Sequence, residues 1–337
     1  MITPKEDNHD REGAAVLYLV VPCYNEEEAL PATIIELKRR MELLIDRKLI
    51  SEDSRVVLVD DGSKDRTPDI IRKAHREETL FSGIHFSRNF GHQAAVLAGY
   101  MFAASRCDCV ISIDADLQQD PDAIGEFLRC YREGYDIVYG VRNSRETDGT
   151  FKKATSQMFY RLMERFDSGI IPNHADYRLL SREALEALSE YKETNVFLRG
   201  LIPTLGFSST VVHFDVRDRQ AGESKYTMSK MLKLAADGIT SFSIAPMHLI
   251  FMIGVFMVII SILIMLQTVI EYFMGKTVAG WSTIVISIWG IGGLQLIAQG
   301  IIGEYVGKNY MESKKRPRYI IEAVEHKDET EKEIKDR

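Results

Sequence analysis

Ile111-Ser-Ile-Asp114-Ala-Asp116-Leu-Gln118 is the most informative stretch in this chain of 337 residues. A short apolar run ends in two carboxylates that stand one residue apart, and an amide follows them. Carboxylate and amide oxygens suit Mg²⁺ or Mn²⁺, and such an ion often carries a substrate phosphate. We therefore expect Asp114, Asp116 and Gln118 to handle a metal-bound diphosphate, which is the leaving group of a nucleotide-activated substrate.

The same apolar run belongs to a regular alternation of strand-sized and helical segments before about residue 220. Strands that alternate with helices predict an α/β domain, Rossmann-like and built on a mainly parallel sheet. Ligands of such sheets bind beyond the carboxyl ends of the strands. The expected strands lie at 16–21, 56–59, 84–86, 110–113 and 137–139, and the expected helices at 27–45, 67–76, 93–104 and 122–131.

A second carboxylate motif, Asp60-Asp61-Gly-Ser63, follows the second expected strand. A carboxylate there can accept a hydrogen bond from a base N–H or a ribose hydroxyl, and the glycine permits a tight turn. We assign Asp61 to the nucleoside. A simple turn followed by a helix cap is the alternative.

The first expected strand ends in Pro22-Cys-Tyr24-Asn25-Glu26. Tyr24 can pack against a nucleobase, and Glu26 can bond a ribose. Helix capping by Glu26 is the alternative. Because all three motifs follow parallel strands, they should meet at one end of the sheet.

Basic side chains downstream are candidates for stabilising the charge of the leaving group. Arginine can grip a phosphate with two bonds, whereas lysine acts as a point charge. Arg219 and Lys225 bracket a glycine-containing loop that can close over phosphates. Taken singly, each cation could instead be a solvated surface charge. The candidates are Arg142, Arg178, Arg219 and Lys225.

Asp176, two residues before Arg178, is the candidate general base. A phosphate acceptor has a second pKa near 6, so it is largely ionised at neutral pH and scarcely needs deprotonation. The alternative for Asp176 is a structural ion pair that orients Arg178 or the sugar.

The composition changes after about residue 220. Segments 247–269 and 281–303 are apolar over about the 20 residues that a membrane-spanning helix needs. Basic residues flank the pair and are scarce between the segments, so the positive-inside rule predicts a hairpin with both chain ends in the cytoplasm. Two buried core helices are the alternative. The predicted location is the cell membrane, with a cytoplasmic catalytic domain.

The expected domain plan has five parts. These are a polar tail at 1–14, a catalytic domain at 15–224, an interfacial amphipathic helix at 225–246, the hairpin at 247–303 and a basic, then charged, cytoplasmic tail at 304–337. The interfacial helix has an ordinary packing helix as its alternative. A net charge of −7 argues against a nucleic-acid partner. Gly290-Ile-Gly-Gly293 suits helix packing in a membrane, so a homo-oligomer is an open expectation.

Six motifs in order resemble the inverting glycosyltransferases of family 2, which have the GT-A fold. They read Val-Pro-x-Tyr-Asn-Glu, Asp-Asp-Gly-Ser, Ser-Arg-Asn-Phe-Gly, Asp-Ala-Asp-Leu-Gln, Asp-Tyr-Arg-Leu and Arg-x-x-Gly-x-Ser-Lys-Tyr. Over roughly residues 16–319 the chain is similar to polyprenyl-phosphate glycosyltransferases of the bactoprenol glucosyltransferase and dolichyl-phosphate mannose synthase-like type. It has no Gln-x-x-Arg-Trp motif, which argues against a processive polysaccharide synthase.

The resemblance implies a role for each candidate residue. The nucleoside would be bound by Pro22, Tyr24, Glu26, Val59 and Asp61, and Asn25 and Ala115 belong to the same nucleotide-sugar site. The metal and donor phosphate would be handled by Asp114, Asp116 and Gln118, and other phosphates by Arg142, Arg219 and Lys225. Asp176 and Arg178 would line the reaction centre. The family often has lysine where this chain has His92, which we leave unassigned because a lone histidine is more often structural.

The expected reaction is transfer of a hexose, glucose from UDP-glucose first, to undecaprenyl phosphate with inversion at the anomeric carbon. Mg²⁺ or Mn²⁺ is the expected cofactor. The alternatives are the same enzyme class with UDP-GlcNAc, GDP-mannose or an amino-sugar donor, a catalytically inactive membrane scaffold, and a soluble nucleotidyltransferase.

Overall fold

A computed structural model describes most of the first domain and one long helix of the second. The described residues are 13–143, 174–193, 197–215 and 281–327, together with the isolated positions 3, 11, 252, 256, 263 and 274. The chain divides into two units, one of which contains the sheet and the other the long helix. Arg219, Lys225, the expected interfacial helix and nearly all of the first expected span lie outside the described residues.

The first unit is built on an eight-stranded sheet, in the order β7-β5-β6-β4-β1-β2-β3-β8. Its strand pairings make β6 and β8 antiparallel to their neighbours, and the other strands all run in one direction. The predicted mainly parallel sheet is therefore confirmed. The strands are β1 (Leu17–Cys23), β2 (Arg55–Asp60), β3 (Phe81–Phe86), β4 (Cys109–Ser112), β5 (Ile137–Arg142), β6 (His174–Ser181), β7 (Ser209–Phe214) and β8 (Ile321–Glu325).

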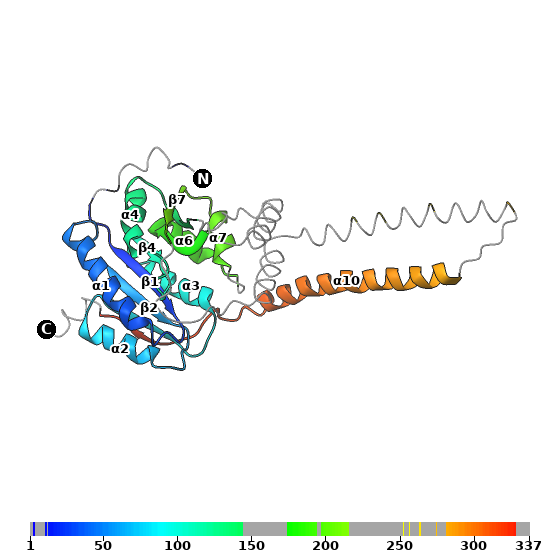
Figure 1. Ribbon diagram of the computed structural model, residues 1–337, viewed down its shortest axis with the longest axis horizontal. Helices are drawn as coiled ribbons and strands as arrows, with labels where there is room; N and C mark the ends of the chain where they lie inside the picture. The colour runs from blue at the N-terminus through cyan, green and yellow to red at the C-terminus, as the bar shows by residue number, and fades with distance from the viewer. Residues whose placement is uncertain are drawn as a thin grey trace. The chain divides into compact units, whose positions relative to one another are not determined.

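Helices cover both faces of this sheet, and Figure 1 shows α1 and α3 on opposite sides of β1 and β2. One core joins β1 to α1, α2 and α4, and the other joins β1 to α3, α6 and α7. The helices of this unit are α1 (Leu30–Asp46), α2 (Thr67–Glu77), α3 (His92–Ala103), α4 (Ile124–Arg132), α6 (Arg182–Glu190) and α7 (Leu198–Thr204), and the short 3₁₀ turn η1 (Pro121–Ala123) precedes α4.

The two cores follow from the two-residue period of a strand. In β1, Leu17 and Leu19 point into one core, while Tyr18 and Val20 point into the other. Helix α3 comes so close to this strand that a Cβ on Gly99 would lie 2.3 Å from Val20 Cγ1. Only glycine fits there, and this contact fixes the helix whose first turn carries His92.

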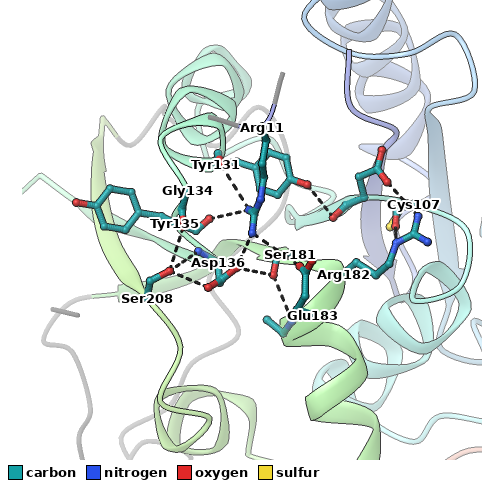
Figure 2. Close-up of polar contacts among 12 residues, drawn as sticks. Arg11, Cys107, Tyr131, Gly134, Tyr135, Asp136, Ser181, Arg182, Glu183 and Ser208 are labelled. Carbon is teal, nitrogen blue, oxygen red and sulfur yellow. Dashed lines mark hydrogen bonds and ion pairs between the residues drawn. The ribbon is translucent and has the colours of Figure 1, made fainter. Parts of the chain in front are cut away.

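A buried carboxylate joins three strands at the end of the sheet opposite the carboxyl ends of the parallel strands. Asp136, just before β5, accepts hydrogen bonds from Ser181 Oγ at 3.1 Å and Ser208 Oγ at 2.8 Å. Arg11 Nη2 donates to the same carboxylate at 2.6 Å, and its guanidinium stacks on Tyr131 (Figure 2). The N-terminal segment is thus fastened to the domain at Arg11, although the sequence assigns residues 1–14 only to a polar tail.

The strand β8 is a finding that the sequence patterns did not predict. It lies within the segment expected to be a cytoplasmic tail, yet it pairs antiparallel with β3, placing Ile84 opposite Val324 and His85 opposite Ala323. Residues 317–327 belong to the same unit as the rest of the sheet. A short apolar run between charged flanks gives too weak a periodic signal to be recognised as a strand.

The second unit contains α10 (Trp281–Ser313), a single helix of 33 residues that includes the second expected span. Among the described residues, no helix is found to be both long and apolar enough to cross a bilayer. The first of the two expected spans is almost entirely outside the residues that are described, so the hairpin stays a prediction.

Candidate functional site

The three polar motifs meet at the carboxyl end of the parallel strands. Strands β2 and β4 flank β1, with Cys23 opposite Asp60 and Val20 opposite Ser112. The loop after each strand begins at this end, so the segments at 22–26, 60–63 and 114–118 share one surface. The parallel topology places the candidate residues as the sequence analysis expected.

Asn25 ties the loop after β1 to the loop after β2. Its backbone N–H donates to Ser63 Oγ at 3.0 Å, and its Oδ1 accepts from Lys64 N at 2.9 Å. Its φ of 52° lies in the left-handed region, which asparagine tolerates better than most residues. The Asn25 side chain therefore has a structural task in this protein, beside its assignment to the nucleotide sugar.

Asp61 faces the protein rather than an open site. Its carboxylate accepts from Phe90 N at 2.7 Å, from Gly91 N at 2.9 Å and from Asn89 Nδ2 at 2.9 Å, and the residue is 2% exposed. Burial raises the pKa of Asp61, and the N–H donors of Phe90 and Gly91 partly offset this rise. In this structure the residue assigned to the nucleoside shapes the loop between β3 and α3.

The carboxylate pair after β4 is held by its own loop. Asp114 and Gln119 form a reciprocal pair, in which Gln119 Nε2 donates to Asp114 Oδ2 at 2.6 Å and Gln119 Oε1 accepts from Asp114 N at 2.9 Å. Asp116 Oδ1 accepts from Gln118 N at 3.1 Å. Burial raises the pKa of Asp114, and the nearby carboxylates of Asp176 and Asp116 raise it further. Negative charge is thus concentrated where a cation would relieve it.

The donors of this loop fit a hard divalent cation that is shared with a substrate. Within the described part of the chain, no group of three or more His, Cys, Asp or Glu side chains is arranged to hold a metal. Mg²⁺ is usually held by one or two carboxylates, with substrate phosphates and water completing its shell. Asp114 and Asp116 match that pattern, and they do not match an all-protein metal cage.

Asp176, on β6, is the centre of an ion-pair cluster. It bonds to Arg178 and accepts from Arg199 Nε at 3.1 Å and Nη2 at 2.9 Å. Burial would raise the pKa of Asp176, but the two guanidiniums outweigh it and hold the pKa well below the usual range. Such a carboxylate is a weak proton acceptor. Of the two interpretations of Asp176, this geometry favours the orienting ion pair.

His92 and Arg199 belong to this cluster, and no sequence pattern assigns a role to either. His92 Nε2 lies 3.7 Å from both Asp114 Oδ1 and Asp176 Oδ2, so one imidazole stands between the two carboxylate groups. Gly91 N donates to the Asp61 carboxylate, and this hydrogen bond fixes the residue just before His92. The His92 imidazole is placed between the two carboxylates as a result. Arg199 follows no recognisable motif, and only the packing of α7 brings it to β6.

The other candidate residues differ in how accessible they are. Tyr24 is 38% exposed, whereas Val59, Ala115 and Arg178 are buried and Arg178 has no exposed surface. Arg178 therefore acts on Asp176 in this structure and presents no surface to a substrate. Arg142 is exposed at the end of β5, and its charge lowers the pKa of Asp114.

Comparison with known proteins identifies the family. Residues 18–189 match the description "Glycosyl transferase family 2". The chain belongs to this family. This membership confirms the resemblance that the six motifs carry.

Two curated relatives and one solved structure illustrate the similarity. The uncharacterized glycosyltransferase YkoT of Bacillus subtilis (strain 168) is 47% identical over 312 residues, which is 93% of each chain. The bactoprenol glucosyl transferase of Shigella phage SfV is 37% identical over 311 residues, 92% of this chain and 99% of that one. Glucosyl-3-phosphoglycerate synthase from Mycobacterium tuberculosis, solved with Mn²⁺, uridine-diphosphate-glucose and phosphoglyceric acid, is 16% identical, with a TM-score of 0.44 over 67% of this chain and 78% of that chain.

Proposed function

We propose that this family 2 glycosyltransferase moves a hexose from a nucleotide sugar, UDP-glucose first, to a polyprenyl phosphate such as undecaprenyl phosphate. The observation that carries the proposal is the meeting of two charge clusters at one end of the sheet. Asp114 and Asp116 form the first, and Asp176 with Arg199 forms the second, with His92 3.7 Å from a carboxylate of each. The relatives named bactoprenol glucosyl transferase support the acceptor class.

The first cluster suits the donor. Asp114 and Asp116 would hold Mg²⁺ or Mn²⁺ against the diphosphate, with Gln118 close to the same group. When bound, the ion stabilises the negative charge that develops on the leaving diphosphate. Arg142 adds positive charge from the end of β5, and this charge lowers the pKa of Asp114. The chain's own residues thus position the diphosphate and stabilise its charge.

The second cluster suits the acceptor. A phosphate oxygen attacks the anomeric carbon from the face opposite the diphosphate, and the bond from that carbon to the diphosphate oxygen breaks. The electron pair leaves with the nucleoside diphosphate, and configuration inverts. Because the acceptor is already ionised at neutral pH, no strong base is needed, which agrees with the low pKa of Asp176. Arg199, whose side chain is 33% exposed, is placed to attract that anion.

The membrane part of the proposal rests on sequence. The apolar segments at 247–269 and 281–303 would form a hairpin, and the segment at 225–246 would lie on the membrane surface, so that a lipid phosphate reaches the catalytic domain. Arg219 and Lys225 would close over phosphates from the loop before that segment. The cell membrane, with both chain ends in the cytoplasm, is the proposed location.

Lipid extraction after incubation with labelled donors tests this proposal. The full-length protein in membranes is incubated with undecaprenyl phosphate and labelled UDP-glucose, UDP-GlcNAc or GDP-mannose in turn. We expect label in the organic phase with one donor, and a loss of about a hundredfold or more in Asp116→Asn. Asp53→Asn is the matched control, because Asp53 is exposed in the turn before β2, at the other end of the sheet.

Two outcomes would reject the proposal. The first is an absence of labelled lipid with every donor. The second is equal lipid labelling by the wild type and Asp116→Asn, because a scaffold that depends on another enzyme in the membrane would give that result.

A further inference from the structure

A cavity of about 530 Å³ opens where β2 and β3 end. This volume is within the range of small-molecule sites in proteins. Tyr24, Lys64, Arg88 and Asn89 line it from the loops at the substrate end of the sheet, and Glu322 lines it from β8. Glu322 lies more than two hundred residues after Gln118 in sequence and belongs to none of the six motifs.

The cavity is separated from the Asp114 and Asp116 pair by about the length of a nucleotide. Strand β4 lies on one side of β1, and β2 and β3 follow on the other side. Because neighbouring strands are about 4.8 Å apart, β3 lies three spacings, about 14 Å, from β4. A base, a ribose and two phosphates in line have about this extent. A nucleotide whose phosphates lie at Asp114 and Asp116 is therefore long enough for its nucleoside to reach the cavity.

Asp60 and Asp61, the two acids at the end of β2, are already engaged. Asp60 Oδ1 accepts from Ser63 N at 2.9 Å, and Asp60 Oδ2 lies 3.3 Å from His85 Nδ1. Asp61 accepts from the loop between β3 and α3. The side chain of Glu322 makes no hydrogen bond or ion pair with the described residues, and the residue is exposed. Of the two acids that line the cavity, Glu322 is the one with free acceptor oxygens.

Strand β8 holds Glu322 in place from both sides. Before it, Tyr319 stacks on Phe86 with ring centroids 5.2 Å apart, and Ile320 O accepts from Ser87 N at 3.1 Å. After it, Glu325 Oε1 lies 3.4 Å from Arg72 Nε. A group that binds a ligand on a fixed strand is better positioned than one on a free loop.

We propose that Glu322 is a donor-binding residue that accepts a hydrogen bond from the nucleoside, from either a base N–H or a ribose hydroxyl. A carboxylate repels phosphate, so its partner must be an uncharged N–H or O–H group. Strand β8 is then a wall of the donor site, supplied by the chain after α10. This inference rests on the proposed function and adds a residue that sets nucleoside affinity.

Calorimetric binding to the full-length protein tests the inference, with UDP, GDP and inorganic pyrophosphate as probes. We expect Glu322→Gln to raise the Kd of the nucleoside diphosphate that the wild type binds by about tenfold, the value of a hydrogen bond to a charged group. The Kd of pyrophosphate should stay unchanged. Glu77→Gln is the control. It removes the same charge from an exposed position at the C-terminal end of α2, outside the cavity lining, and should bind both probes as the wild type does.

An unchanged or lower Kd for the nucleoside diphosphate in Glu322→Gln would overturn the inference, as would an equal loss of affinity for pyrophosphate. Lipid labelling separates this failure from failure of the proposed function. If the wild type labels lipid and Glu322→Gln binds donor normally, only the role of Glu322 falls. If the wild type labels no lipid but Glu322→Gln loses nucleotide affinity, the proposed transfer falls and the nucleoside contact stands.

Discussion

Arg199 donates a hydrogen bond to each carboxylate oxygen of Asp176, from Nε to Oδ1 at 3.1 Å and from Nη2 to Oδ2 at 2.9 Å. This fork of two bonds has a fixed geometry that an ammonium group cannot reproduce. Because Arg178 bonds to the same carboxylate, Asp176 is kept ionised and oriented. A site of this kind positions charge and has little capacity to remove a proton.

Arg199→Lys tests the importance of the fork. The substitution keeps the charge but loses one of the two bonds, so Asp176 and its neighbours lose their fixed orientation. We expect kcat for glycolipid formation to fall about tenfold or more, since small misplacements at a reaction centre are costly. Arg129→Lys, at an exposed ion-paired position on α4, is the control and should leave kcat unchanged. A wild-type kcat in Arg199→Lys would show that the fork has no role in the reaction.

The low pKa of Asp176 predicts how stability depends on acid. In the unfolded chain this carboxyl takes up a proton near pH 4, whereas in the folded protein it stays ionised well below that pH. Its contribution to stability is therefore present above about pH 4 and is lost progressively as the pH falls further.

Thermal unfolding between pH 7 and pH 3 measures this loss. Asp176→Asn should be less stable throughout, because it leaves two guanidiniums without their partner. Its Tm should nevertheless fall less steeply below pH 4 than that of the wild type. Parallel Tm curves for the two proteins would contradict the assigned pKa direction.

Gly62→Ala tests the close packing of the loop after β2 against the loop after β3. Gly62 has a φ of 65°, and a Cβ there would lie 2.2 Å from the backbone carbon of Arg88. Gly206 has a similar φ of 71° with open space around it. Gly206→Ala should cost about 1 kcal/mol from backbone strain alone. Gly62→Ala should cost at least about 2 kcal/mol more, in line with overpacking, and should weaken nucleotide binding.

Denaturant unfolding of the two glycine variants provides the comparison. Equal free energies of unfolding would mean that the two loops separate easily. The tight contact between them would then be no part of the site.

Arg11→Ala tests the attachment of the N-terminal segment. The variant removes the 2.6 Å bond to Asp136 and leaves that carboxylate with only its serine donors. We expect the free energy of unfolding to fall by about 1–3 kcal/mol. The KM for donor should not change, because this cluster lies at the end of the sheet away from the substrate motifs. A changed KM with unchanged stability would contradict this assignment.

The strands and the meeting of the motifs were predictable because both follow from local patterns. A four-residue apolar run such as 110–113 predicts a strand, and parallel neighbours bring Asp60 and Asp114 to the same end of the sheet. The sequence pattern predicts that the first helix starts at residue 27, three residues before α1 begins. Pro31 is suited to the first turn of a helix, and the helix begins at Leu30.

Side-chain directions and long-range partners were not predictable from these patterns. Asp61 lies in the expected motif, but its orientation toward Phe90 and Gly91 depends on how a distant loop folds. Arg199 reaches Asp176 only through the packing of α7, and Glu322 reaches the cavity only through the pairing of β8. The positions of Arg219 and Lys225 stay predictions, since neither is among the residues described.

The most direct measurement is the anomeric configuration of the product, determined by mass spectrometry and NMR after purified full-length protein reacts with undecaprenyl phosphate and UDP-glucose. Direct attack by a lipid phosphate at the carboxylate end of the sheet predicts a hexosyl undecaprenyl phosphate whose α-linked donor sugar has become β-linked. A product that retains the α configuration, or an organic phase without sugar for every nucleotide donor supplied, would contradict the account.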